Sequence, residues 1–266
     1  RNPGAVMVSA VGPDLKNSLA AIEDVARIQI WSDLILKKND LDYFQIPRIC
    51  LADSGVFNLF DQDWMYGTPD NALNKPLSIV LTDEIARTIF GDINPVGLNL
   101  FDQSGTYSFL VTGVIKKRND DHLQFDAMVS MVTRSLENST ILHTYSTQQW
   151  LTYFLVRKDT DPELLEGHIY DQLLKLLPSS GNESVNRDFK VILNPLEEIY
   201  FDRKTRDLTV VHGNRSLVTV FIASAFLIMI IACINFINLS TAGALKRARE
   251  VGLRKILGSD RATLIL

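Results

Sequence analysis

The sequence has few of the residues that build metal sites and disulfide frameworks. It contains only two cysteines and four histidines among 266 residues. Cys50 lies in the long N-terminal part and Cys233 lies inside an apolar run, so the two cannot plausibly pair. Both are interpreted as small buried hydrophobic residues. The histidines are scattered, without the His-x-x-x-His or Cys/His spacing of a metal site. No metal-binding residue is predicted.

Motifs of nucleotide and acyl-transfer chemistry are also missing. No Gly-x-x-x-x-Gly-Lys-Ser/Thr loop is present, and the nearest glycine pair, Gly91 and Gly97, has no lysine and is better explained as a turn. No Gly-x-Ser-x-Gly elbow occurs. Paired acids such as Glu197 and Glu198 have no neighbouring partner and are interpreted as solvated loop charges. The chain is predicted to be no enzyme, with no catalytic residue and no cofactor.

Charge is absent from one long stretch and uneven elsewhere. Residues 216–245 carry no charged side chain, residues 246–266 carry a net charge of +4, and residues 1–215 carry a net charge of −8. Acidity on this scale argues against a nucleic-acid partner. Basic residues at one end of a membrane span mark the cytoplasmic side. We therefore expect a protein of the bacterial inner membrane, with residues 1–215 periplasmic and residues 246–260 cytoplasmic.

The uncharged stretch contains a predicted transmembrane helix at about residues 217–239. Nineteen of these 23 residues are apolar, and a helix of that length, about 34 Å, crosses a hydrocarbon core of about 30 Å. Asn235 and Asn238 lie three residues apart and so on one face. An amide without a partner is costly in hydrocarbon, so this face is predicted to contact another helix or the interface. That favours a bundle of helices over a single tether.

The N-terminal part alternates strand-like and helix-like segments, which predicts an α+β domain with β-α-β elements and two lobes divided near residues 130–148. Thr82 is expected to cap one helix, and Gly91 to end it. Phe57, Phe60, Trp64 and Tyr66 are interpreted as core residues rather than as a substrate or partner groove. Strands are expected at residues 5–11, 46–52, 77–81, 109–114, 150–157 and 189–193, and helices at residues 14–26, 82–90 and 162–177.

A basic segment with two interpretations follows the predicted span. Leu245, Ala248, Gly252 and Ile256 form a stripe at helical spacing. Gly252 costs this helix about 1 kcal/mol relative to alanine and leaves room for a close approach, and Gly258 is expected to end the helix. The segment either rests on anionic lipid or docks on a cytoplasmic partner. Taken alone, the residues favour neither interpretation.

Three blocks carry a resemblance to a known family. They read PLSIVLTDEIARTIFGDINPVGLNL, FLVTGVIKKRNDDHLQFDAMVS and FIASAFLIMIIACINFINLSTAGALKRAREVGLRKILGSDRATLI. In combination they resemble FtsX/MacB-type ABC transporter permeases of Bacteroidetes-like bacteria. The likeness covers most of residues 1–266.

The resemblance implies a MacB-like periplasmic core domain at residues 1–212 and the start of an FtsX-like permease domain at residues 213–266. It implies a coupling helix at about residues 244–257 and the start of the next membrane segment at about residues 260–266. A separate ABC ATPase subunit would bind the coupling helix, and ATP hydrolysis would move the periplasmic domain in a process termed mechanotransmission. By resemblance, the ATPase-coupling positions are Arg247, Arg249, Glu250, Gly252, Arg254, Lys255 and Gly258.

Further expectations concern the partners and the rest of the protein. A second permease copy or homologous half, membrane lipid, and a periplasmic adaptor or outer-membrane protein are the partners implied. The chain starts at Arg1 without a signal segment and stops in an apolar run, so a fragment is expected. Two alternatives stay open: a single-pass sensor or anchored binding protein, and a non-transporting FtsX-like regulator of a cell-wall hydrolase. No residue identifies the substrate.

Overall fold

The computed structural model describes residues 6–31, 33–118, 121–145, 148–176, 189–199 and 213–257. The chain divides into two compact units, Arg1–His212 and Gly213–Leu266. We call these the N-terminal unit and the C-terminal unit and describe each by itself.

In the described residues of the N-terminal unit, eleven strands form one mixed sheet. The strand order is β1-β11-β2-β5-β10-β7-β9-β8-β3-β4, with β6 paired to β9. The pairs β5–β10 and β7–β9 are parallel and the remaining pairs are antiparallel. The strands are β1 (Val6–Val8), β2 (Ile22–Trp31), β3 (Leu34–Lys37), β4 (Tyr43–Ile46), β5 (Ile49–Ala52), β6 (Trp64–Tyr66), β7 (Ser78–Thr82), β8 (Asn99–Asp102), β9 (Ser108–Ile115), β10 (Ala127–Ser130) and β11 (Gln148–Val156).

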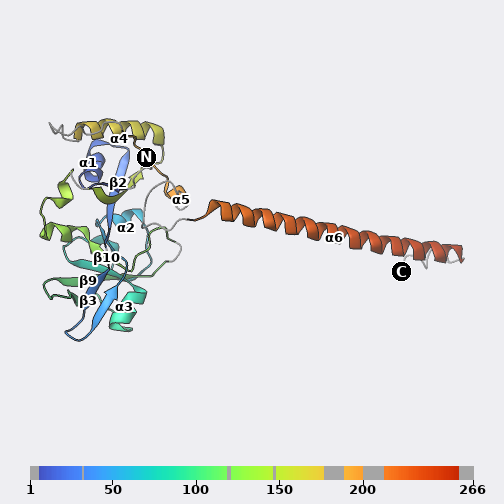
Figure 1. Ribbon diagram of the computed structural model, residues 1–266, viewed down its shortest axis with the longest axis horizontal. Helices are drawn as coiled ribbons and strands as arrows, with labels where there is room; N and C mark the ends of the chain where they lie inside the picture. The colour runs from blue at the N-terminus through green and yellow to red at the C-terminus, as the bar shows by residue number, and fades with distance from the viewer. Residues whose placement is uncertain are drawn as a thin grey trace. The chain divides into compact units, whose positions relative to one another are not determined.

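Short helices cover the sheet. Figure 1 shows α1 and α4 together at one end of the sheet and α3 at the other end. The helices of this unit are α1 (Val11–Ser18), α2 (Val56–Leu59), α3 (Asp83–Phe90), α4 (Pro162–Leu176) and α5 (Leu196–Ile199), with 3-10 turns η1 (Pro69–Asn71), η2 (Met131–Leu136) and η3 (Ile141–His143).

The hydrophobic core consists of two clusters on opposite faces of the central strands and a third under α1 and α4. In β5, Leu51 belongs to one central cluster while its neighbours Cys50 and Ala52 belong to the other. Successive side chains of a strand point to opposite faces, and all four residues of β5 are buried because both faces are covered. Burial also raises the pKa of the Cys50 thiol. The predicted interpretation of Cys50 as a buried hydrophobe is confirmed.

The predicted α+β class is confirmed, and the sheet is continuous across the division suggested near residues 130–148, because β11 pairs with β2. The expected helix at residues 14–26 is wrong in its second half. It ends at Ser18, and Ile22 begins β2. The sequence places apolar residues there at helical spacing, but pairing of residues 22–26 with β11 overrides that pattern.

Two further predictions need correction. Thr82 precedes α3 as expected, but its hydroxyl caps no helix amide and donates instead to the carbonyl oxygen of Asp126 at 3.1 Å. The expected strand at residues 46–52 is two strands, because Pro47 follows the end of β4 and β5 begins only at Ile49. Gly91 ends α3 with a positive φ of 73°, as predicted.

Candidate coupling surface on α6 and the Arg27 joint

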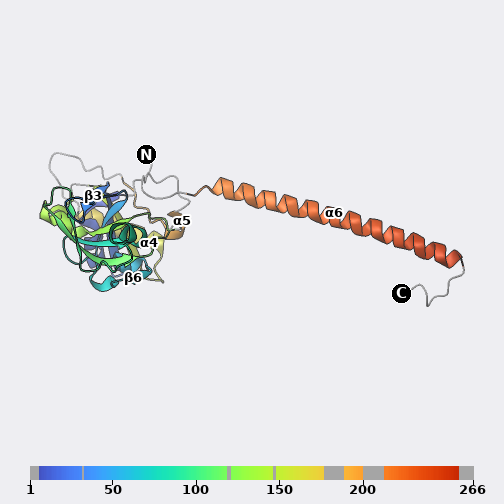
Figure 2. The same cartoon turned by 90° about the horizontal axis from the view of Figure 1, so that it is seen from below.

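The C-terminal unit is dominated by one helix, α6 (Arg215–Ile256), which runs without interruption for 42 residues (Figure 2). The Asn214 side chain starts it by accepting hydrogen bonds from the amides of Ser216 and Leu217. At 1.5 Å per residue it is about 63 Å long. It is long and apolar enough to cross a membrane. The segments expected as separate transmembrane and coupling helices, residues 217–239 and 244–257, lie in this one helix up to its end at Ile256.

The polar residues inside the apolar part of α6 fall into two groups. The hydroxyls of Thr219 and Ser224 donate to the carbonyl oxygens of Arg215 and Val220, one turn earlier in the same helix. Within the described part of the chain, no such bond satisfies Asn235 or Asn238. Their amides share one exposed face, as the three-residue spacing predicts. The contact of this face with another helix stays a prediction.

The expected coupling residues occupy the last turns of α6. Arg247, Arg249, Glu250, Arg254 and Lys255 are all exposed. Arg254 and Lys255 also lie in the last turn, where cations interact favourably with the helix dipole. Gly258 lies outside the described residues, as does the expected membrane segment at residues 260–266.

Gly252 is the informative member of this surface. A Cβ atom built on it meets no atom within 4 Å, and its φ is not positive. Neither space nor backbone conformation of α6 therefore requires glycine at this position. Any need for glycine here comes from a surface outside the described residues.

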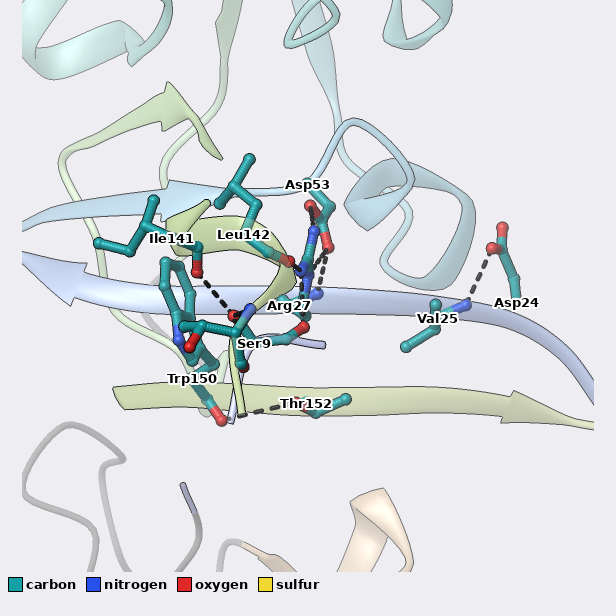
Figure 3. Close-up of polar contacts among 10 residues, drawn as sticks. Ser9, Asp24, Val25, Arg27, Asp53, Ile141, Leu142, Trp150 and Thr152 are labelled. Atoms are coloured by element: carbon teal, nitrogen blue, oxygen red, sulfur yellow. Dashed lines mark hydrogen bonds and ion pairs between the residues drawn. The ribbon is translucent and has the colours of Figure 1, made fainter. Parts of the chain in front are cut away.

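A second polar site, the Arg27 joint, lies inside the N-terminal unit and was not predicted (Figure 3). Arg27 on β2 is 6% exposed and forms a two-pronged ion pair with Asp53, with Nε at 2.8 Å from Oδ2 and Nη2 at 2.9 Å from Oδ1. Its Nη1 donates to the carbonyl oxygens of Ser9, at 2.7 Å, and Leu142, at 2.8 Å. One guanidinium thus connects β2, the loop after β5, the turn between β1 and α1, and the turn η3.

Neighbouring bonds complete the joint. Ser9 Oγ donates to the carbonyl oxygen of Ile141 at 2.6 Å (Figure 3) and accepts from the amide of Thr144 at 3.1 Å. The Tyr145 hydroxyl donates to the Asp14 carboxylate on α1. Burial and this bond raise the pKa of Tyr145 to about 12. Residues 141–145 are therefore fixed to the α1 end of the unit.

A second ion cluster lies beside α3. The Asp126 carboxylate accepts two bonds from Arg48, at 2.9 and 3.0 Å, and one from Lys117 at 2.6 Å. Burial raises the pKa of Asp126, but these bonds outweigh it, and the pKa lies below its ordinary value of 3.8. Lys117 also pairs with Glu84 at 3.1 Å. The cluster contains both signs of charge and is internally satisfied, which is typical of a structural site.

One small cavity lies among the described residues of the N-terminal unit. The cavity beside Lys117, Asp121 and Phe125 has room for about 10 Å³, roughly that of one water molecule. No group of three potential metal ligands occurs among the described residues. Phe57 stacks edge-on against Trp64 with ring centroids 4.9 Å apart, within a hydrophobic cluster, so these aromatics are core residues as interpreted from the sequence.

Comparison with solved structures identifies the class of fold. The chain is similar to a domain of a protein described as a permease from Porphyromonas gingivalis, with a TM-score of 0.57 and 16% identity over 64% of this chain and 71% of that one. No protein-family model matches the sequence. No curated protein matches it either.

Two further structures are similar at lower scores. They are the periplasmic region of MacB from Actinobacillus actinomycetemcomitans (TM-score 0.47, 18% identity, 62% of this chain and 72% of that one) and the extracellular domain of the noncanonic ABC-type transporter YknZ from Gram-positive bacteria (0.49, 14%, 65% and 85%). At these identities the likeness concerns the fold. The expected fold of the N-terminal unit is confirmed: it is that of the permease domain from P. gingivalis.

Proposed function

We propose that this chain is part of an ABC transporter permease in which a separate ATPase docks on the last turns of α6. The observation that carries the proposal is the continuity of α6. One rigid helix contains both the apolar stretch that can cross a membrane and the exposed basic turns that follow it. A displacement of the basic end would therefore be transmitted along the helix axis, since a continuous helix has no hinge to absorb it.

The fold of the N-terminal unit supports the same proposal, since a permease domain shares it. The basic residues after the span support a cytoplasmic position for that end and a position outside the membrane for the N-terminal unit. The unpaired face of Asn235 and Asn238 is then a contact with a second permease copy or another membrane helix. Anionic lipid is a further partner of the basic turns. The substrate would be moved or handed on by the N-terminal unit, with no catalysis by this chain.

The proposal is tested by capturing the ATPase from membranes that contain the intact protein. A photo-crosslinking residue in place of Leu253, between the expected coupling positions, should trap a protein with a nucleotide-binding loop, identified by mass spectrometry. Arg249→Glu combined with Arg254→Glu should reduce that capture at least ten-fold, because the docking surface reverses its charge. Lys175→Glu on α4 is the matched control and should leave capture unchanged.

A substitution of Gly252 is a second test of docking. A Cβ atom at this position meets no atom within 4 Å, so Gly252→Leu should retain membrane insertion and helix content while ATPase capture falls. Capture that survives both the charge reversal and Gly252→Leu contradicts docking at this surface. Trapping of a signalling protein instead of an ATPase supports the single-pass sensor.

A further inference from the structure

The segment 189–195, which we call the strap, follows α4 along the chain and lies in no strand or helix. Its side chains alternate in burial: Phe189, Val191 and Leu193 are half-buried and pack against the hydrophobic cluster of α1 and α4. The residues between them are exposed. The prediction of a strand at residues 189–193 is therefore wrong. The alternation of half-buried and exposed side chains on which it was based is present.

Two contacts attach the strap to one flank of α4. The Phe189 and Tyr170 rings have centroids 5.1 Å apart at a tilt of 47°. The Leu193 amide donates to Glu166 Oε1 at 2.8 Å. Glu166 and Tyr170 are four residues apart, and so lie on one side of the helix. The inward face of α4, formed by Leu165, Ile169 and Leu173, is instead buried in the cluster with α1.

The strap is attached more weakly than the elements beneath it. The α1 end of the unit is connected to the sheet by the buried Arg27 joint and by β-sheet pairing of β1 and β2 with β11. The strap has half-buried side chains and lies in no described strand of the sheet. Segments with few buried contacts and no sheet pairing open at lower free energy than core strands.

We propose that residues 189–195 open from α4 as an independent unit while α1, α4 and the sheet stay folded. In the sequence, the strap lies between α4 and α6. Its role rests on the proposed function: if α6 is displaced, the strap is the flexible element that transmits the displacement to the N-terminal unit. Opening exposes the flank of α4 at Glu166 and Tyr170. The device would limit how much of a displacement reaches the sheet.

Hydrogen exchange of the intact protein in lipid nanodiscs tests this proposal. In the wild type, amides of residues 190–194 should exchange at least ten-fold faster than those of β2 and α4. Combining Phe189→Ser with Glu166→Met removes the ring contact and the amide hydrogen bond and should accelerate strap exchange at least ten-fold more, with β2, β11 and α4 unchanged. Ile192→Ser, at an exposed position of the same strap, is the matched control and should change nothing.

Two results would overturn the proposal. One is strap exchange as slow as that of β2 in the wild type. The other is a parallel rise of exchange in α4 and β2 in the double variant, because the strap would then belong to the cooperative core. The measurement involves no ATPase, so a strap that does not open leaves the docking proposal standing. Loss of ATPase capture, in turn, leaves the exchange pattern intact.

Discussion

The N-terminal unit and α6 use the same apolar residue types in opposite ways. Ile79 in β7 is completely buried in a hydrophobic cluster, whereas Ile228 in α6 is 67% exposed. In the first unit, apolar side chains are removed from water by the chain itself. In α6 no side chain of the apolar stretch is buried by protein. The difference indicates that each region is adapted to a different surrounding medium, and that hydrophobic composition alone does not distinguish them.

The largest expected effect comes from placing the same substitution in both regions. Ile79→Asn should destabilise the N-terminal unit by about 4 kcal/mol, because it removes buried apolar surface and leaves an amide without partners. Ile228→Asn should leave the melting of that unit unchanged. Near-UV circular dichroism during thermal melting of the intact chain in detergent measures both. Equal losses in the two variants would mean that α6 contributes to the core, contrary to its exposure.

Periodicity explains which parts of the fold could be predicted. β7, β9, α3 and α4 lie where the patterns at residues 77–81, 109–114, 82–90 and 162–177 indicated, since each has one clear period and its own turn residues. Residues 22–26 were misassigned because their pairing with β11, which is distant in sequence, decides their structure. In the strap, the alternation of apolar and polar residues correctly indicated which side chains are half-buried, but the segment pairs with no described strand.

The coupling surface could be proposed from local sequence, because charge and a glycine at helical spacing are visible there. The Arg27 joint could not, since Arg27, Ser9, Asp53 and Leu142 come from four separate parts of the chain. One signal was available. An arginine within the run Val25–Ile30 is flanked by apolar residues of a strand, and a buried guanidinium requires partners. The sequence thus indicates that Arg27 requires hydrogen-bond or ion-pair partners, but it does not identify them.

The second expected effect compares a buried ion pair with an exposed one. Arg27→Met should destabilise the unit by about 3 kcal/mol, because the Asp53 carboxylate loses its counter-charge and two carbonyl groups lose their donor. Arg27→Lys should restore part of this, since lysine keeps the charge but not the planar fork. Urea unfolding of the intact protein measures the difference.

The matched control for the joint is Arg87→Met. Arg87 pairs with Asp92 at 3.5 Å, with side chains 64% and 94% exposed, so a change within about 0.5 kcal/mol is expected. A loss at Arg87 comparable to that at Arg27 would show that charge, rather than burial and bonding at the joint, determines the stability.

The smallest expected effect is a dependence on pH at the second ion cluster. The pKa of Asp126 is lowered in the fold, so the ionised carboxylate stabilises the folded state. This contribution is complete above the ordinary pKa of 3.8 and is lost as the pH falls through the lower, folded value. Asp126→Asn should therefore be less stable than the wild type at neutral pH, and the difference in stability should narrow as the solution is acidified below about that ordinary pKa.

Chemical unfolding between pH 7 and pH 2.5 measures this difference in stability, with Asp92→Asn as the exposed control. A stability difference that widens on acidification would show that Asp126 is held in its protonated form. The ion pairs of Asp126 with Arg48 and Lys117 would then not stabilise the N-terminal unit, and this contrast with α6 would be lost.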